Sequence, residues 1–262
     1  FKRMEDYEHG SNDLRSQGGP LKVSKATDEG PLYDALRAAA TELGIPHNPD
    51  YNGVSQEGIV RTQTTISNGV RMSTARCYLK PIKNRKNLRV ETGAHTQKVI
   101  MEGKKCVGID YHCKGKTIRA KASKEVIICT GGVASPQLLE LSGIGQPELL
   151  RSHGIKIEHE LMGVGEHLRD HINAPIKFHM KRGDLSYNKR MQGLGPAWQV
   201  LRYLFQKRGF MSLPSAPMLA FLRTRDDMET PDVQMHIVPY AVKNYKKRLL
   251  HDFPGITLAV YQ

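Results

Sequence analysis

The chain has 262 residues, of which 39% are hydrophobic and 25% are charged. This length suits one large domain or two small ones, and the composition is typical of a globular protein. No run of residues approaches the ~18–20 apolar residues of a membrane-spanning helix, and Gly and Pro show no collagen-like period. These observations argue against a fibrous, transmembrane or disordered chain.

Basic residues outnumber acidic ones by 39 to 26, which gives a formal net charge of +13 at pH 7. Such a surplus can favour a nucleic acid, an acidic surface or an anionic ligand. The Lys and Arg are spread widely, and no zinc-finger spacing or RNA-binding signature accompanies them. We therefore expect a solvated basic surface and no nucleic-acid partner. The alternative is a basic binding module, for nucleic acid or an acidic surface, without catalytic activity.

The first predicted element is a helix over residues 31–44, where Leu32, Leu36, Ala39 and Leu43 recur at helical spacing. Gly44 stands where a left-handed cap belongs. The Gly-, Asn- and Pro-rich stretch that follows, residues 45–58, predicts an ordered loop.

From Asn87 the pattern changes to short strands divided by Gly or Lys turns. Glu125–Cys129 contains four consecutive apolar residues, which is typical of a strand covered on both faces. The predicted strands are 87–93, 97–103, 105–113, 116–122 and 124–132.

A helix should follow these strands, with Ser135 as its N-cap and Pro136 as its first residue. A second short helix is predicted over 147–154, so that residues 87–160 are mixed α/β. Ligand-facing turns are expected where the carboxyl ends of strands meet helices.

After Asp170 the pattern predicts an α+β domain with an antiparallel sheet. An amphipathic helix over 196–209 separates the first of its strands from the others. The predicted strands are 174–180, 217–223, 232–238 and 255–262.

The residues alone show no catalytic constellation. His167 and His171 are four apart, but Leu168 stands where the zinc-protease motif needs Glu, and we expect no metal site. Gly163-Val164-Gly165 lacks the third glycine of a dinucleotide loop and predicts a turn. The four cysteines form no CxxC pair and predict structural thiols in a reducing, cytoplasmic compartment.

Residues 131–145, GGVASPQLLELSGIG, closely resemble the second signature of the glucose–methanol–choline (GMC) family of flavin-dependent oxidoreductases. Ser135-Pro136, Leu138-Leu139 and Ser142–Gly145 fit that pattern, whereas Gly132 departs from it by a small change. The segments 18–23, 48–58, 69–81, 87–99, 163–171 and 231–239 are similar to other parts of the family in the same order. The nearest similarity is to the choline and alcohol dehydrogenase branch.

The resemblance implies an α/β plus α+β fold, part of a two-domain FAD-binding, Rossmann-like architecture with an antiparallel-sheet substrate domain. Residues 1–75 would form a connection and part of the substrate side. Residues 76–172 would belong to the FAD-binding domain, and residues 173–262 to the substrate-binding domain.

The resemblance also implies a function. The parent protein would use FAD to oxidise a primary alcohol, choline-like or another, by hydride transfer, and would pass electrons to an acceptor or to oxygen. Thr96, Thr130, Gly131 and Gly132 would lie near the adenine half of FAD. The location would be cytoplasmic, with peripheral membrane association left open.

The resemblance assigns no catalytic residue to this chain, because the family's dinucleotide fingerprint and catalytic histidine would lie outside it. The sequence opens at Phe1 without an initiator Met and closes inside a strand-like run, Ile256–Tyr261. We therefore expect an internal piece of a longer protein, which by itself should be catalytically inactive and bind FAD poorly.

Overall fold

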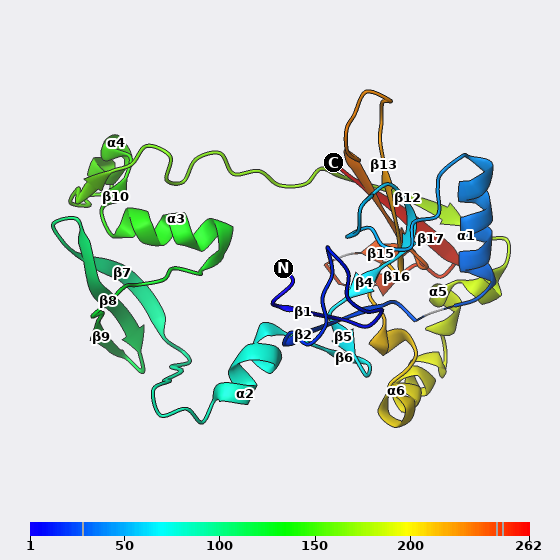
Figure 1. Ribbon diagram of the computed structural model, residues 1–262, viewed down its shortest axis with the longest axis horizontal. Helices are drawn as coiled ribbons and strands as arrows, with labels where there is room; N and C mark the ends of the chain where they lie inside the picture. The colour runs from blue at the N-terminus through cyan, green and yellow to red at the C-terminus, as the bar shows by residue number, and fades with distance from the viewer. Residues whose placement is uncertain (28, 245, 248) are drawn as a thin grey trace. The chain divides into compact units, whose positions relative to one another are not determined.

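The computed structural model describes residues 1–27, 29–244, 246–247 and 249–262. They form two compact units, one made of residues 1–85 with 171–262 and the other of residues 86–170 (Figure 1). We refer to them as the sheet unit and the signature unit. The predicted domain limits at 75/76 and 172/173 lie close to the ends of the signature unit, without coinciding with them.

A five-stranded antiparallel sheet forms the centre of the sheet unit. Its strands follow the order β12-β17-β14-β13-β3, so four of the five are the strands predicted after Asp170. The fifth strand was not predicted, and only its first residue, Gly58, lies in the predicted loop. It is short, and its four buried residues pair with β13. The strands are β12 (Asn173–His179), β17 (Gly255–Tyr261), β14 (Val233–Val238), β13 (Met218–Leu222) and β3 (Gly58–Arg61).

Helix α1 (Pro31–Glu42) covers one face of this sheet, as Figure 1 shows. Tyr33 and Ala40 of the helix pack against Met218 and Ile237 of the strands. Gly44 has a φ of 73°, so the predicted left-handed residue after the helix is confirmed. The opposite face carries a smaller apolar cluster around Phe221.

The rest of the sheet unit consists of short elements. The predicted helix over 196–209 is confirmed as α6 (Gly195–Gln206). The other helices are a π-helical turn at Ala75–Leu79, α2 (Lys80–Ile82), α5 (Tyr187–Arg190) and 3₁₀ turns at Gly183–Leu185 and Phe210–Ser212. The short strands are β1 (Glu5–Tyr7), β2 (Leu21–Lys25), β4 (Gln63–Thr64), β5 (Ile66–Ser67), β6 (Val70–Arg71), β15 (Val242–Asn244) and β16 (Leu249–Leu250).

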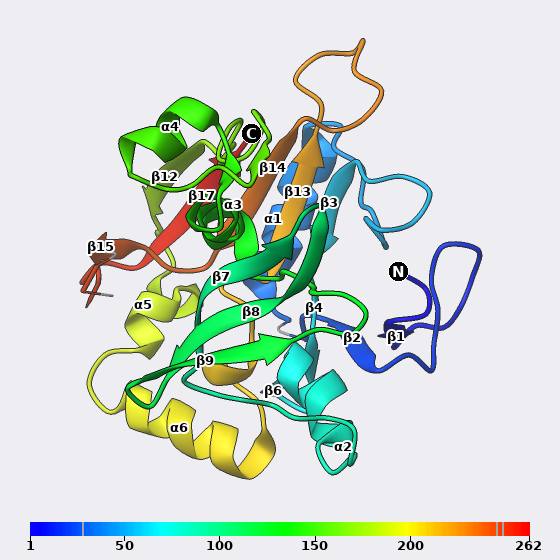
Figure 2. The same cartoon turned by 90° about the vertical axis from the view of Figure 1, so that its left-hand side faces the viewer.

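The signature unit is built on a three-stranded antiparallel meander, whose strands lie side by side in Figure 2. Helix α3 packs against its first strand, and Val99, Leu138, Leu150 and Val164 are buried. The elements are β7 (His95–Glu102), β8 (Lys105–Cys113), β9 (Lys116–Lys121), α3 (Gly131–Leu141), β10 (Ile144–Gly145), α4 (Pro147–Ser152) and β11 (His159–Glu160).

Two predicted strands are absent from the signature unit. Glu125–Cys129, predicted as a strand covered on both faces, forms no strand, and the side chain of Ile127 is 73% exposed. Residues 87–93 form no strand either. Apolar composition favours a strand only where neighbouring strands can accept its hydrogen bonds. Among the described residues none pairs with these two segments.

The predicted start of the signature helix is also wrong. Helix α3 begins at Gly131, so Ser135 is not its N-cap and Pro136 lies inside it. Pro136 is the sixth residue of α3, beyond the four amides that lack a partner at a helix start, so the helix forgoes one hydrogen bond there. Within the described chain, no helix has both the length and the apolar composition needed to cross a membrane.

Candidate functional site

The turn that opens helix α3 contains three of the four residues predicted to lie near FAD. Thr130 is its N-cap residue, but the side chain of Thr130 caps no backbone amide. Its hydroxyl instead lies 3.0 Å from that of Ser135. Because the first amides of a helix have no partner within the helix, they remain available to an acceptor outside it.

The two glycines at this turn leave the helix start open. Gly131 has a φ of 89°, a conformation that favours glycine. A Cβ atom added to Gly131 or to Gly132 would meet no other atom within 4 Å. The backbone is therefore accessible to a ligand from the side where side chains would project. This geometry fits a group that approaches the backbone closely, as a dinucleotide does at a helix start.

Thr96, the fourth predicted residue, lies on β7 opposite Tyr111 of β8 and is half-buried. Helix α3 packs against the same strand, but no hydrogen bond in the described part of the chain joins Thr96 to the 130–132 turn. The structure therefore gathers three of the predicted residues in one turn and places the fourth on the adjoining strand.

The remaining signature residues have structural roles. Ser142, which is 6% exposed, accepts a hydrogen bond of 2.9 Å from the backbone amide of Val99 and donates one of 2.5 Å to the carbonyl of Leu138. Gly143 has a φ of 84°, and its missing side chain leaves room for the carbonyl of Lys156. These contacts fix the C-terminal end of α3 on strand β7.

Replacing Ser142 with alanine is expected to lower the free energy of unfolding by about 1–3 kcal/mol, because the buried amide of Val99 loses its acceptor. Ser152 provides a matched control, since its exposed hydroxyl donates to the carbonyl of Leu149 at the end of α4. Chemical denaturation of both variants measures the difference. Equal stabilities would contradict the role given to Ser142.

A cluster of titratable rings lies on the sheet unit. The ring of Tyr261 lies 4.5 Å from that of His236 and 6.2 Å from that of His171, measured between centroids. Asn173 donates a hydrogen bond of 3.2 Å to the Tyr261 hydroxyl. His236 alternates along β14 with Met235 and Ile237, which pack on the α1 side, so it faces the opposite side of the sheet.

The pKa of His236 lies below its ordinary value because burial disfavours the charged ring, and the nearby His171 acts in the same direction. The folded protein therefore resists protonation that the unfolded chain accepts at about pH 6.5. We expect the free energy of unfolding to fall as the pH is lowered through this value. His236→Gln should flatten the profile between about pH 7 and about pH 5.

Denaturation at several pH values measures this effect, with His153→Gln as the control because His153 is exposed on the other unit. A profile for His236→Gln as steep as that of the unchanged protein would show that His236 does not carry the pH dependence.

The two histidines that are four residues apart do not form a helical pair of metal ligands. His167 lies outside any helix with a φ of 59°, so His167 and His171 do not share a helix face. No group of three or more His, Cys, Asp or Glu in the described chain could hold a metal ion. Gly163-Val164-Gly165 lies in a turn, as predicted.

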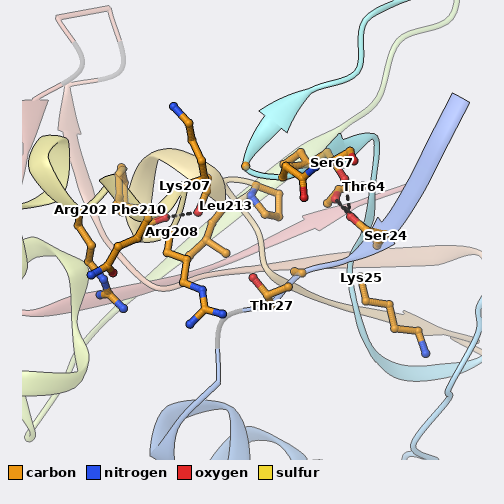
Figure 3. A pocket seen from close by; sticks show the side chains of 18 of the residues that line it. Ser24, Lys25, Thr27, Thr64, Ser67, Arg202, Lys207, Arg208, Phe210 and Leu213 are labelled. Atoms are coloured by element: carbon orange, nitrogen blue, oxygen red, sulfur yellow. Dashed lines mark hydrogen bonds between the residues drawn. The ribbon is translucent and has the colours of Figure 1, made fainter. Parts of the chain in front are cut away.

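A large cavity lies elsewhere, within the sheet unit, and has a volume of about 1390 Å³. Its walls are strand β2, the β5–β6 hairpin, helices α5 and α6, and the segment 207–214 (Figure 3). No local sequence pattern predicts this cavity, because its walls come from segments far apart in the chain. The one available signal is a pair of cations after the amphipathic helix, Lys207 and Arg208, which the sequence alone does not distinguish from a solvated surface.

The family profile described as GMC oxidoreductase matches residues 1–173 of this chain. The chain belongs to the GMC oxidoreductase family. The resemblance read from residues 131–145 is thereby confirmed, and FAD is the cofactor that GMC oxidoreductases use.

Named relatives fit this assignment. The chain is 39% identical over 244 residues to "Oxygen-dependent choline dehydrogenase 1" of Chromohalobacter salexigens, covering 92% of this chain and 43% of the relative. It is 35% identical over 249 residues to "Oxygen-dependent choline dehydrogenase" of Escherichia coli, covering 94% of this chain and 44% of that protein. The chain thus spans less than half the length of these relatives.

Two solved structures share the fold of this GMC oxidoreductase chain. A formate oxidase matches with a TM-score of 0.84 and 21% identity, covering 99% of this chain and 51% of that one. A pyridoxine 4-oxidase from Mesorbium loti matches with a TM-score of 0.81 and 20% identity, covering 100% and 47%. The mixed α/β fold therefore corresponds to about half of a GMC oxidoreductase structure.

Proposed function

We propose that this chain is part of an FAD-dependent oxidoreductase that oxidises a primary alcohol. The observation that carries the proposal is the open start of helix α3, which lies inside the GMC signature. No side chain caps its first amides, and a Cβ atom added to Gly131 or Gly132 would meet nothing within 4 Å. The proposal extends to the division of the chain: the signature unit belongs to the FAD side, and the sheet unit to the substrate side.

In this proposal the adenine half of FAD lies against the 130–132 turn and near Thr96. The amides at the start of α3 attract the negative charge of a phosphate, and Gly131 and Gly132 permit close approach of the backbone. The half-buried position of Thr96 on β7 offers its backbone or hydroxyl to the same part of the cofactor. When bound, FAD supplies the acceptor for the hydride.

The alcohol proton needs a base, and the family resemblance assigns that histidine to a part of the protein outside this chain. The rings of His171, Tyr261 and His236 lie on the side of the sheet opposite α1. They are proposed to line the substrate side rather than to act as the base. The lowered pKa of His236 keeps its ring neutral at neutral pH.

The identity to oxygen-dependent choline dehydrogenases supports a choline-like alcohol as substrate, with oxygen or another electron acceptor as partner. The four free cysteines support a reducing, cytoplasmic location. Peripheral membrane association remains part of the proposal. Family membership favours this function over the alternative of a basic binding module without activity.

The first test is spectroscopic. Protein that contains this chain together with the flanking sequence found in its relatives should purify yellow and release FAD on denaturation. Anaerobic addition of a primary alcohol should bleach the flavin spectrum, and choline should be compared with an uncharged alcohol of similar size. A colourless, folded protein that cannot be reconstituted with FAD would overturn the proposal.

A second test addresses the turn itself. Gly132→Glu places a negative charge at the start of α3 without steric conflict, because a Cβ there meets nothing within 4 Å. We expect at least a tenfold loss of FAD affinity, since the new carboxylate repels the phosphates of the cofactor. Gly163→Glu, at an equally open position of the same unit, is the control. Equal FAD affinities in the two variants would place the cofactor away from this turn.

A further inference from the structure

The cavity of the sheet unit has an excess of positive charge that its own acidic residues do not neutralise. Six cationic side chains and three carboxylates are found among the described residues that line it. Asp6 is engaged by Lys22, and Glu8 accepts a hydrogen bond from the backbone amide of Lys25. Glu29 lies 3.8 Å from Arg37, outside the lining. The carboxylates of the cavity are therefore already engaged.

Three arginines of the lining, by contrast, have no acidic partner among the described residues: Arg190, which lies over the ring of Tyr187, and Arg202 and Arg208. Arg202 lies on the last turns of α6, and Arg208 follows the helix. Their guanidinium groups extend in the same direction in Figure 3, whereas the ammonium group of Lys207 extends the opposite way and lies 4.9 Å from the ring of Tyr203. A pair of unpaired guanidinium groups favours a planar anion that accepts paired hydrogen bonds.

The same cavity offers an aromatic wall. Phe210 packs edge-on against the buried Tyr187, with ring centroids 5.2 Å apart, and Trp198 of α6 also lines the cavity. The side chain of Trp198 is 62% exposed. Flat aromatic surfaces of this kind contact an apolar or aromatic body.

The segment that carries Arg208 and Phe210 is held in place by two close contacts. A Cβ on Gly69 would lie 2.4 Å from the carbonyl oxygen of Lys207, so only glycine lets the β5–β6 hairpin reach the end of α6. The side-chain oxygen of Gln199 accepts a hydrogen bond of 3.0 Å from the amide of Phe210. Gln199 is the one buried residue of α6, and its contact fixes the turn that carries Arg208 and Phe210. The backbone that carries the cationic and aromatic groups is thus fixed in position.

We propose that this cavity binds an organic anion that carries a carboxylate or phosphate on an aromatic or apolar body. Arg202 and Arg208 receive the anionic group, and Phe210, Tyr187 and Trp198 contact the body. The excess of positive charge opposes a quaternary ammonium ion, so this is a site separate from that of a choline-like substrate. The inference does not depend on the proposed oxidation.

The test measures binding of three probes with the same ring system: 1-naphthoate, 1-naphthyl phosphate and the neutral 1-naphthalenemethanol. Titration calorimetry on the purified protein gives their dissociation constants at low salt. At least one of the two anions should bind about tenfold or more tightly than the neutral probe, the factor that corresponds to one charge-assisted hydrogen bond. A preference between the two anions identifies carboxylate or phosphate as the natural group.

Arg202→Gln and Arg208→Gln should each weaken binding of the anions about tenfold and leave affinity for the neutral probe unchanged. Both residues are exposed, so these substitutions leave the fold intact. Arg3→Gln, an exposed arginine outside the cavity lining, removes the same charge and should have less than a twofold effect. Failure of both anions to bind, equal affinity for all three probes, or equal weakening by Arg3→Gln would overturn the proposal.

Discussion

Replacing Arg15 with methionine is expected to lower the free energy of unfolding by about 3–5 kcal/mol, because it leaves two carboxylates without their cation in a largely buried site. The side chain of Arg15 is 2% exposed and pairs with Glu5 and with Asp50, the latter at 2.6 Å. Its guanidinium group also lies 3.7 Å from the centroid of the Tyr7 ring. One side chain thus joins β1 to the loop before β3.

The pH dependence of stability provides a second readout for the same variant. The hydrogen bond from Arg15 is the main cause of the lowered pKa of Glu5. A carboxyl group with a lowered pKa stabilises the fold above its unfolded pKa, and this contribution disappears as the pH falls through the folded value. Arg15→Met should remove that acid-dependent loss, so its stability should vary less between about pH 5 and about pH 3.

Arg182→Met is the matched control. Arg182 pairs with Asp184 at 2.7 Å, but the two side chains are 65% and 62% exposed. An exposed ion pair contributes about 0–1 kcal/mol, so this substitution should have little effect. Comparable losses of stability for Arg15→Met and Arg182→Met in chemical denaturation would contradict the importance given to burial.

Replacing Gly143 with alanine is expected to cost about 3 kcal/mol or more, because two penalties add. The φ of 84° is strained for any residue with a Cβ atom, at about 1–2 kcal/mol. That Cβ would also lie 2.3 Å from the carbonyl oxygen of Lys156, so the backbone must move. The motion would separate the end of α3 from the segment leading to β11.

Gly154→Ala separates the two penalties. Gly154 has a φ of 67° in the same unit, and its Cβ would meet nothing within 4 Å. This variant should lose only about 1–2 kcal/mol, the cost of the backbone conformation. Thermal and chemical denaturation of both variants measure the difference. If Gly143→Ala were no less stable than Gly154→Ala, the close contact with Lys156 would not matter.

Local periodicity was sufficient to predict helices α1 and α6 and four strands of the antiparallel sheet. Each of these elements is long enough for its apolar positions to repeat, and a repeat reports which face is buried. The signature Ser142–Gly145 was equally informative, because the positive φ of Gly143 and the buried hydroxyl of Ser142 are requirements on single residues. The FAD-proximal assignments of Thr96 and the 130–132 turn stay predictions.

Tertiary structure decided what sequence patterns could not. Glu125–Cys129 has the composition of a buried strand, yet a strand needs neighbours that supply hydrogen bonds, and composition does not reveal whether they are present. The proximity of His236, Tyr261 and His171 depends on the pairing of β14 with β17. Likewise, Arg202 and Arg208 line a cavity only because β2 and the β5–β6 hairpin close it from sequence positions more than 130 residues away. Contacts over such separations depend on chain topology, which local sequence patterns do not reveal.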